Sequence, residues 1–268
     1  LRITSVIMKN IFKNIIRDQF HATENHNSEE YKTRFHNYVN SVEYNNREYD
    51  KVESSKYLLS IIIEHLNFSE AIKSIESTNH NLDNSFIELI YHSIENNLSL
   101  KHSSIITDRV HEDDKVFYKG EEIHPEGPLK VKINELPILV NPWNGDRVLD
   151  NMFTINSDNI FDGDSYSWNI QNIYLYPMDI VVCQGGNHSQ FAARIKNQGK
   201  TLIKEVRNYS NLYNEIYFDG YDFRKKINKS VIELEYSREQ VFYSGVIFEL
   251  GRYILDDKYH TFSLTKNS

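Results

Sequence analysis

Glycine and proline are distributed very unevenly along this chain of 268 residues. No glycine precedes Gly120, and no proline precedes Pro125. Because these two residues are the strongest local breakers of regular structure, a long stretch without them favours helices joined by polar turns. We therefore expect a helical domain over residues 1–124 and a second domain, which contains strands, over residues 125–268.

Apolar residues at helical spacing support a helical first half. They recur over residues 6–16, 57–66 and 86–94. The polar stretch 29–57 carries scattered aromatic residues and is typical of one long amphipathic helix. A turn is expected at 79–84, where asparagine is frequent.

Composition excludes several classes of protein. The formal net charge of −8 argues against unspecific binding to long duplex nucleic acid, because such binding needs a basic surface. Cys183 is the single cysteine, so the chain can form no internal disulfide, and we expect a reducing compartment, the cytoplasm. No apolar run approaches the roughly 18 residues of a membrane helix, so no membrane partner is expected.

β-Branched and aromatic runs predict strands in the second half. The expected strands are 129–133, 136–140, 173–176, 180–183, 201–206, 216–218 and 231–236, with a hairpin over 115–123. The polar segment 156–169 is typical of a loop, 240–255 has a helical apolar face, and the last residues are expected to form a tail. The predicted fold class is α+β, a helical N-terminal domain followed by a mixed β-sheet domain with flanking helices.

The stretch 180–195 has the order strand, glycine turn and helix. Gly185 and Gly186 can adopt positive φ angles and let the backbone approach a ligand closely. Three polar residues follow, Asn187, His188 and Ser189. The first or the third of them is the expected helix cap, and free amides at such a helix N-terminus favour a phosphate. The alternative is that the glycine pair is only a sharp connection between strand and helix.

A second motif, residues 141–147, surrounds one tryptophan and one arginine with turn-forming residues. Trp143 is expected to be a buried tryptophan within a loop. Arg147 carries a planar guanidinium group, which is suited to binding phosphate. The acidic stretch 158–164 lacks the ligand spacing of an EF-hand, and we expect no metal site there.

Residues 129–206 resemble the ParB/sulfiredoxin-like superfamily in the order of their elements. The counterpart motifs are Asn141-Pro142-Trp143-Asn144-Gly145-Asp146-Arg147, Pro177-Met178-Asp179-Ile180-Val181-Val182, and Gly185-Gly186-Asn187-His188-Ser189 with Phe191-Ala192-Ala193. Members of this superfamily bind a nucleotide, so the resemblance implies a nucleoside triphosphate, with or without Mg²⁺, as cofactor. It also implies that the Gly185–Ser189 turn holds the phosphates and that Arg147 approaches them from the other motif.

Two departures from the superfamily pattern affect the expected chemistry. Asn187 stands where sulfiredoxin has its catalytic cysteine, so reduction of a sulfinic acid is not expected. Ser189 stands where the family has an arginine, so a cationic partner for phosphate has to come from Arg194, Lys196 or Arg147. No basic helix-turn-helix follows residue 206, which argues against a partitioning DNA clamp.

Three functions compete at this point. The first is an enzyme of phosphoryl transfer or hydrolysis, an NTPase or a nuclease, acting on a nucleotide or a nucleic acid end. Its catalytic residues would be His188 for proton transfer or for holding a phosphoryl oxygen, Arg147 for developing charge, and the neighbouring Asn187. Asp146 or Asp179 would hold Mg²⁺. The second is a non-catalytic nucleotide sensor whose N-terminal helices bind a partner protein, and the third is a purely structural protein.

Overall fold

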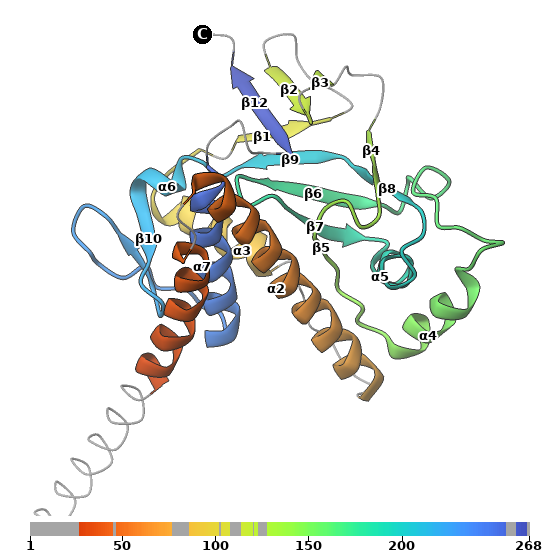
Figure 1. Ribbon diagram of the computed structural model, residues 1–268, viewed down its shortest axis with the longest axis horizontal. Coiled ribbons are helices and arrows are strands. Elements are labelled where there is room, and N and C mark those ends of the chain that lie inside the picture. The colour runs from red at the N-terminus through yellow and green to blue at the C-terminus, as the bar shows by residue number, and fades with distance from the viewer. Residues whose placement is uncertain are drawn as a thin grey trace, which may run out of the picture.

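The structure is a computed structural model of the chain, and it combines helices with a mixed β-sheet in an α+β fold (Figure 1). It describes residues 27–44, 47–76, 86–101, 103–107, 114–119, 121–122, 128–255 and 261–266. The helix expected over 6–16 and the turn expected over 79–84 lie outside these residues. The helical region precedes the sheet along the chain, as the distribution of glycine and proline predicts.

Helices make up most of the described N-terminal part. Residues 27–43 are helical, and α2 (Glu48–Glu76) and α3 (Phe86–Asn97) follow. The single helix predicted over 29–57 is wrong, because the first helix ends before Tyr44 and α2 begins at Glu48. Glu48 and Asp50 lie in the first turn of α2, where negative charge interacts favourably with the helix dipole.

A five-stranded mixed sheet forms the centre of the molecule, in the strand order β1-β9-β6-β7-β5. These strands are β1 (Ser103–Ile106), β9 (Glu205–Asn208), β6 (Gln171–Tyr176), β7 (Ile180–Gly185) and β5 (Ile138–Leu139). β6 pairs with β7 in antiparallel fashion, whereas β9 and β5 add to this pair in parallel. The apolar run of β7 is buried, as its sequence predicts for a central strand.

Alternate side chains of the central strands enter two cores, one on each face of the sheet. Ile173 and Val182 face a core shared with α3, with α7 (Arg238–Tyr253) and with the N-terminal helices. This core contains residues from both sides of the boundary expected at 124/125, so the two parts pack against each other. The boundary itself stays a prediction.

The second core carries the elements that build the candidate site. Tyr174 and Val181 face it, together with Phe191 of α5 (Asn187–Ile195) and Val148 of α4 (Gly145–Thr154). An antiparallel pair, β4 (Leu129–Lys132) and β8 (Lys200–Ile203), closes this core. The right-hand part of Figure 1 shows α5 beside the end of β7 and α4 below α5.

The remaining elements include several departures from the sequence prediction. They are β2 (Asp114–Tyr118), β3 (Glu121–Glu122), α6 (Leu212–Glu215), β10 (Ile216–Phe218), β11 (Phe223–Lys225) and β12 (Phe262–Lys266). The strand predicted over 231–236 is wrong, since only an isolated bridge forms at Val231. The C-terminal tail instead contains β12, which pairs with β2. The segment 201–206 is divided between β8 and β9, which belong to different sheets.

Candidate functional site

The turn between β7 and α5 has the backbone that the sequence predicts, but its cap is different. Gly186 is the N-cap of α5, with φ of 77°, and no side chain caps the helix. Asn187 instead accepts a hydrogen bond at Oδ1 from the backbone N–H of Asn141, at 2.8 Å. Ser189 donates its hydroxyl to the Gly186 carbonyl. The expected capping role of these two polar residues is therefore wrong, and the first amides of α5 have no side-chain cap.

The glycine pair is required by the packing of the chain against itself. A Cβ atom at Gly185 would lie 2.3 Å from the carbonyl oxygen of Asn169, and one at Gly186 would lie 2.6 Å from Cδ1 of Ile170. The absence of side chains at the two glycines thus leaves room for the segment 169–170, which precedes β6. The protein's own chain, namely the Asn169 carbonyl and the Ile170 side chain, therefore requires glycine at these positions, whether or not a ligand also binds at the turn.

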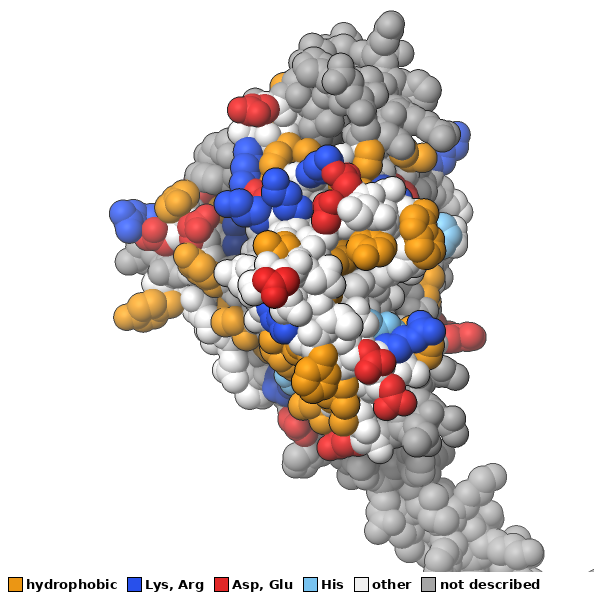
Figure 2. Space-filling model, turned by 90° about the vertical axis from the view of Figure 1, so that its right-hand side faces the viewer, with side chains coloured by type: hydrophobic (Ala, Val, Ile, Leu, Met, Phe, Trp, Pro, Cys, Tyr) orange, Lys and Arg blue, Asp and Glu red, His pale blue; other side chains and the backbone are white. Residues whose placement is uncertain are grey.

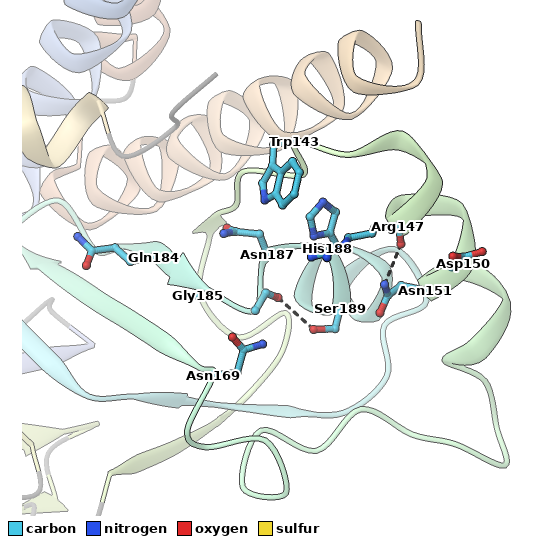
Figure 3. Close-up of a pocket in the computed structure, with 11 residues that line it drawn as sticks. Trp143, Arg147, Asp150, Asn151, Asn169, Gln184, Gly185, Asn187, His188 and Ser189 are labelled. Carbon is cyan, nitrogen blue, oxygen red and sulfur yellow. Dashed lines mark hydrogen bonds between the residues drawn. The ribbon is translucent and has the colours of Figure 1, made fainter. Parts of the chain in front are cut away.

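A hollow of about 510 Å³ opens at the N-terminus of α5 (Figure 3). It is lined by Trp143, Arg147, Asp150, Asn151, Asn169, Gln184, Gly185, Gly186, Asn187, His188 and Ser189. The predicted phosphate-site residues of the glycine turn, Gly185 to Ser189, therefore meet Arg147 of the second motif in one place. The sequence did not reveal Asp150, Asn151, Asn169 or Gln184, because no local pattern marks them.

His188 lines this hollow although its side chain is only 8% exposed. Its Nε2 accepts a hydrogen bond from the backbone N–H of Asn144, at 3.1 Å. The neutral ring then carries its hydrogen on Nδ1. Burial, assisted by the charge of Arg147, lowers the pKa of His188 to about 4. Near neutral pH this residue is thus an uncharged donor, and its Nδ1 has no hydrogen-bond partner among the described residues.

Trp143 and Arg147 form the opposite wall of the hollow. Asn144 caps α4 by accepting a hydrogen bond from the backbone N–H of Arg147, which fixes the first turn of that helix. The ring of Trp143 meets the ring of His188 edge to face, with centroids 5.2 Å apart. The Arg147 guanidinium carbon lies 5.2 Å from the Trp143 ring centroid. Trp143 is 39% exposed, so the prediction of a buried tryptophan is wrong.

A fully buried polar network supports the turn from behind. Gln190 donates through Nε2 to the Gly185 carbonyl, at 3.1 Å, and to Oδ1 of Asn172, at 3.0 Å. Its Oε1 accepts hydrogen bonds from Asn172 and from the hydroxyl of Thr201. The same amide nitrogen contacts Sγ of Cys183. Because the network is hydrogen-bonded throughout, it holds the turn in a single conformation.

Two of the three cations expected to contact phosphate are engaged elsewhere. Arg194 donates to the carbonyls of Ile133 and Leu136 and forms an ion pair with Glu64. Lys196 donates to carbonyl oxygens at the end of α4. Among the three, Arg147 alone lines the hollow.

The carboxylates suggested for Mg²⁺ do not line the hollow. Asp179 is buried and bonded to the hydroxyls of Tyr174 and Thr261, and Asp146 is absent from the lining. Within the described ranges, no group of three or more His, Cys, Asp or Glu side chains is arranged to hold a metal ion. Asp150 is the carboxylate that shares the hollow with Arg147.

None of the helices in the described part of the chain is long and apolar enough to cross a membrane. No curated protein and no solved structure matches the chain. One family model matches, over residues 17–261, and its description is a family of unknown function, DUF6710. Because the match covers most of the chain, the chain belongs to the DUF6710 family.

Proposed function

We propose that this protein binds the phosphate of a nucleotide in the hollow at the N-terminus of α5. One observation carries the proposal: the uncapped N-terminus of α5, Arg147 and His188, which carries its proton on Nδ1, line the same hollow. Helix amides and their dipole favour an anion, and a guanidinium is a suitable partner for phosphate. The exposed ring of Trp143 offers a stacking surface for the base.

The state of His188 favours a binding role over proton transfer. A general base has to be accessible at a nitrogen lone pair, but Nε2 of His188 is already occupied by the Asn144 N–H. Its pKa of about 4 leaves it uncharged near neutral pH. We therefore assign His188 to holding a phosphoryl oxygen, so non-catalytic nucleotide binding becomes the leading proposal. The relationship to the ParB/sulfiredoxin-like superfamily and a cytoplasmic location remain part of the proposal.

A second candidate is hydrolysis of the bound phosphate ester. It is favoured by Asp150, which lies one helical turn after Arg147 and lines the same hollow. Asp150 would orient a water molecule or hold Mg²⁺ carried in by a triphosphate, while Arg147 stabilises developing charge. Release of phosphate that requires Asp150 separates this candidate from simple binding.

A protein partner is proposed for the exposed face of α2. Six large apolar side chains on this helix are between 46% and 68% exposed, and five of them recur at helical spacing along one face: Tyr57, Ile61, Phe68, Ile72 and Ile75. Exposed apolar stripes of this kind mark interaction surfaces. Co-sedimentation of a partner protein with this chain that depends on a nucleotide would support the proposal that the chain is a nucleotide sensor.

Thermal unfolding with ATP, CTP, GTP and UTP, each with and without Mg²⁺, tests the proposed function. At a ligand concentration of about 100 times Kd, binding adds roughly 2.7 kcal/mol to the free energy of unfolding. We expect at least one nucleotide to raise the melting temperature and this rise to disappear in His188→Ala. No rise with any nucleotide would contradict the proposal.

A further inference from the structure

Both tryptophans of the chain stand beside the hollow at α5. Trp143 lines it, and Trp168 immediately precedes the lining residue Asn169. They are 39% and 78% exposed, and Tyr166, two residues before Trp168, is 52% exposed. Tryptophan is highly buried on average, so an exposed tryptophan in the lining of the hollow and a second one adjacent to the lining residue Asn169 favour a ligand with more than one stacking ring.

Lysine side chains hold the loop that carries Trp168. Lys196 donates to the carbonyl of Ile155, where the loop leaves α4, and Lys204 donates to the carbonyl of Ser167. The backbone N–H groups of Asn169 and Ile170 both donate to the carbonyl of Tyr166, which closes the segment into a compact turn. The exposed aromatic residues are therefore presented on a fixed turn, which reduces the entropy lost when a ligand stacks on them.

Exposed lysines continue this surface away from the hollow. Lys132 and Lys200 face each other across β4 and β8, and with Phe161 and Asp162 they border a second hollow of about 540 Å³. Neither ammonium group forms an ion pair within the described part of the chain. Figure 2 shows Lys and Arg side chains gathered in the upper part of this face of the molecule.

The two hollows lie at opposite ends of α5. The first opens at the helix N-terminus, and Asn197, just beyond the C-terminus, lines the second. A helix of nine residues is about 13 Å long, which is a span that a free mononucleotide does not cover but a short strand does. Arg147 and Trp143 thus lie at one end of α5, and the lysines Lys132 and Lys200 lie at the other.

We propose that the hollow takes the phosphorylated end of a single-stranded nucleic acid. The inference rests on the proposed function, because the terminal phosphate occupies the α5 N-terminus beside Arg147 and the Nδ1–H of His188. The terminal base stacks on Trp143, the following bases stack near Trp168, and Lys132 and Lys200 neutralise later phosphates. A duplex does not fit, since its bases already stack on each other and the chain's net charge of −8 provides no extended basic footprint.

Two single-tryptophan variants test this inference by fluorescence. Trp143→Phe leaves Trp168 as the only indole, and Trp168→Phe leaves Trp143. Each is titrated with thymidine 5′-monophosphate, with hexathymidylate phosphorylated at the 5′ or the 3′ end, with unphosphorylated hexathymidylate, with hexauridylate and with a duplex. We expect quenching of Trp143 by the mononucleotide and by the phosphorylated hexamer, and quenching of Trp168 by the hexamer alone.

Affinity provides the second readout. One further stacked base should make the phosphorylated hexamer bind at least about tenfold tighter than the mononucleotide. The double variant Lys132→Gln with Lys200→Gln should weaken hexamer binding and reduce its salt dependence, while mononucleotide binding stays unchanged. Lys101→Gln with Lys229→Gln removes the same charge from two exposed positions outside both hollows and serves as the matched control.

The outcomes separate this inference from the proposed function. A hexamer that binds no tighter than the mononucleotide, or that leaves Trp168 emission unchanged, overturns the inference. If Trp143 is still quenched in that case, the proposed nucleotide site stands. Duplex binding as tight as that of the hexamer also overturns it. If no ligand affects either indole, both the inference and the proposed function fail.

Discussion

The backbone N–H of Asn144 donates a hydrogen bond of 3.1 Å to Nε2 of His188, which ties the start of α4 to the start of α5. A backbone N–H can only donate, so the imidazole must present a lone pair there. A second proton on the ring, at Nε2, would point towards the backbone N–H of Asn144, and two donors cannot bond to each other. The contact therefore agrees with the pKa of about 4 that burial and Arg147 give this residue.

This contact predicts a pH dependence of stability. Below pH 6.5 the unfolded chain protonates His188, whereas the folded protein does so only near pH 4. The unfolded state binds more protons between these values, so stability is complete above pH 6.5 and is lost as the pH falls towards 4. Urea unfolding of the parent and of His188→Gln at pH 7, 5.5 and 4.5 measures the difference. Glutamine can still accept from Asn144 but does not titrate, so we expect a shallower loss in the variant; equal slopes would contradict this.

Removing the guanidinium from the hollow should weaken binding without affecting the fold. Arg147 is exposed and contacts its surroundings mainly through the Trp143 ring. Arg147→Gln should therefore lower nucleotide affinity about tenfold or more, the usual value of a charge-assisted hydrogen bond, with an unchanged melting temperature in the absence of ligand. The control is Arg47→Gln, which neutralises an 81% exposed side chain near the start of α2. Unchanged affinity in calorimetric titration would exclude Arg147 from the phosphate site.

Local sequence patterns were sufficient to place the turn and the helix of this site. The run 180–183, the glycine pair and the Ala-rich helix are encoded within a few residues, so their order could be predicted. Asn169 and Asp150 could not be predicted, because their presence at the hollow depends on how α4 and the loop before β6 pack. The steric requirement for Gly185 could not be predicted for the same reason: the atom that imposes it, the Asn169 carbonyl oxygen, is distant in sequence.

The same limit applies to the remaining charged residues and strands. Arg194 has a side chain suited to binding phosphate, but in the fold it donates to two carbonyls that precede β5. The run 231–236 has strand composition, yet only Val231 finds a bridging partner. β-Propensity depends on an available neighbouring strand, which the local sequence does not specify.

The buried network behind the turn predicts a large effect of one amide. Gln190→Leu would leave Oδ1 of Asn172 without its donor and the hydroxyl hydrogen of Thr201 without its acceptor, both in a buried environment. Each unsatisfied group costs about 1–3 kcal/mol, so we expect the free energy of unfolding to fall by about 3 kcal/mol or more. Asn214→Leu removes an exposed amide and should change it by less than about 0.5 kcal/mol. A similar small loss for both variants in urea unfolding would show that the network does not stabilise the fold.

The two adjacent glycines should respond to alanine in the order opposite to that expected from their backbone angles. Gly186 has the positive φ, of 77°, but its nearest obstacle is the terminal methyl of Ile170, which can rotate away. Gly185 would place Cβ 2.3 Å from the Asn169 carbonyl oxygen, and a backbone atom cannot be moved by a rotamer change.

We therefore expect Gly186→Ala to cost about 1–2 kcal/mol, the usual penalty of a left-handed alanine, and Gly185→Ala to cost more. Gly185→Ala should also displace residues 169–170 and with them Trp168. Urea unfolding of the two variants compares their stabilities. The emission of Trp168, measured in the Trp143→Phe background, reports the displacement of residues 169–170. If Gly186→Ala proves the more damaging of the two, backbone strain rather than contact with the Asn169 carbonyl explains why this turn contains two glycines.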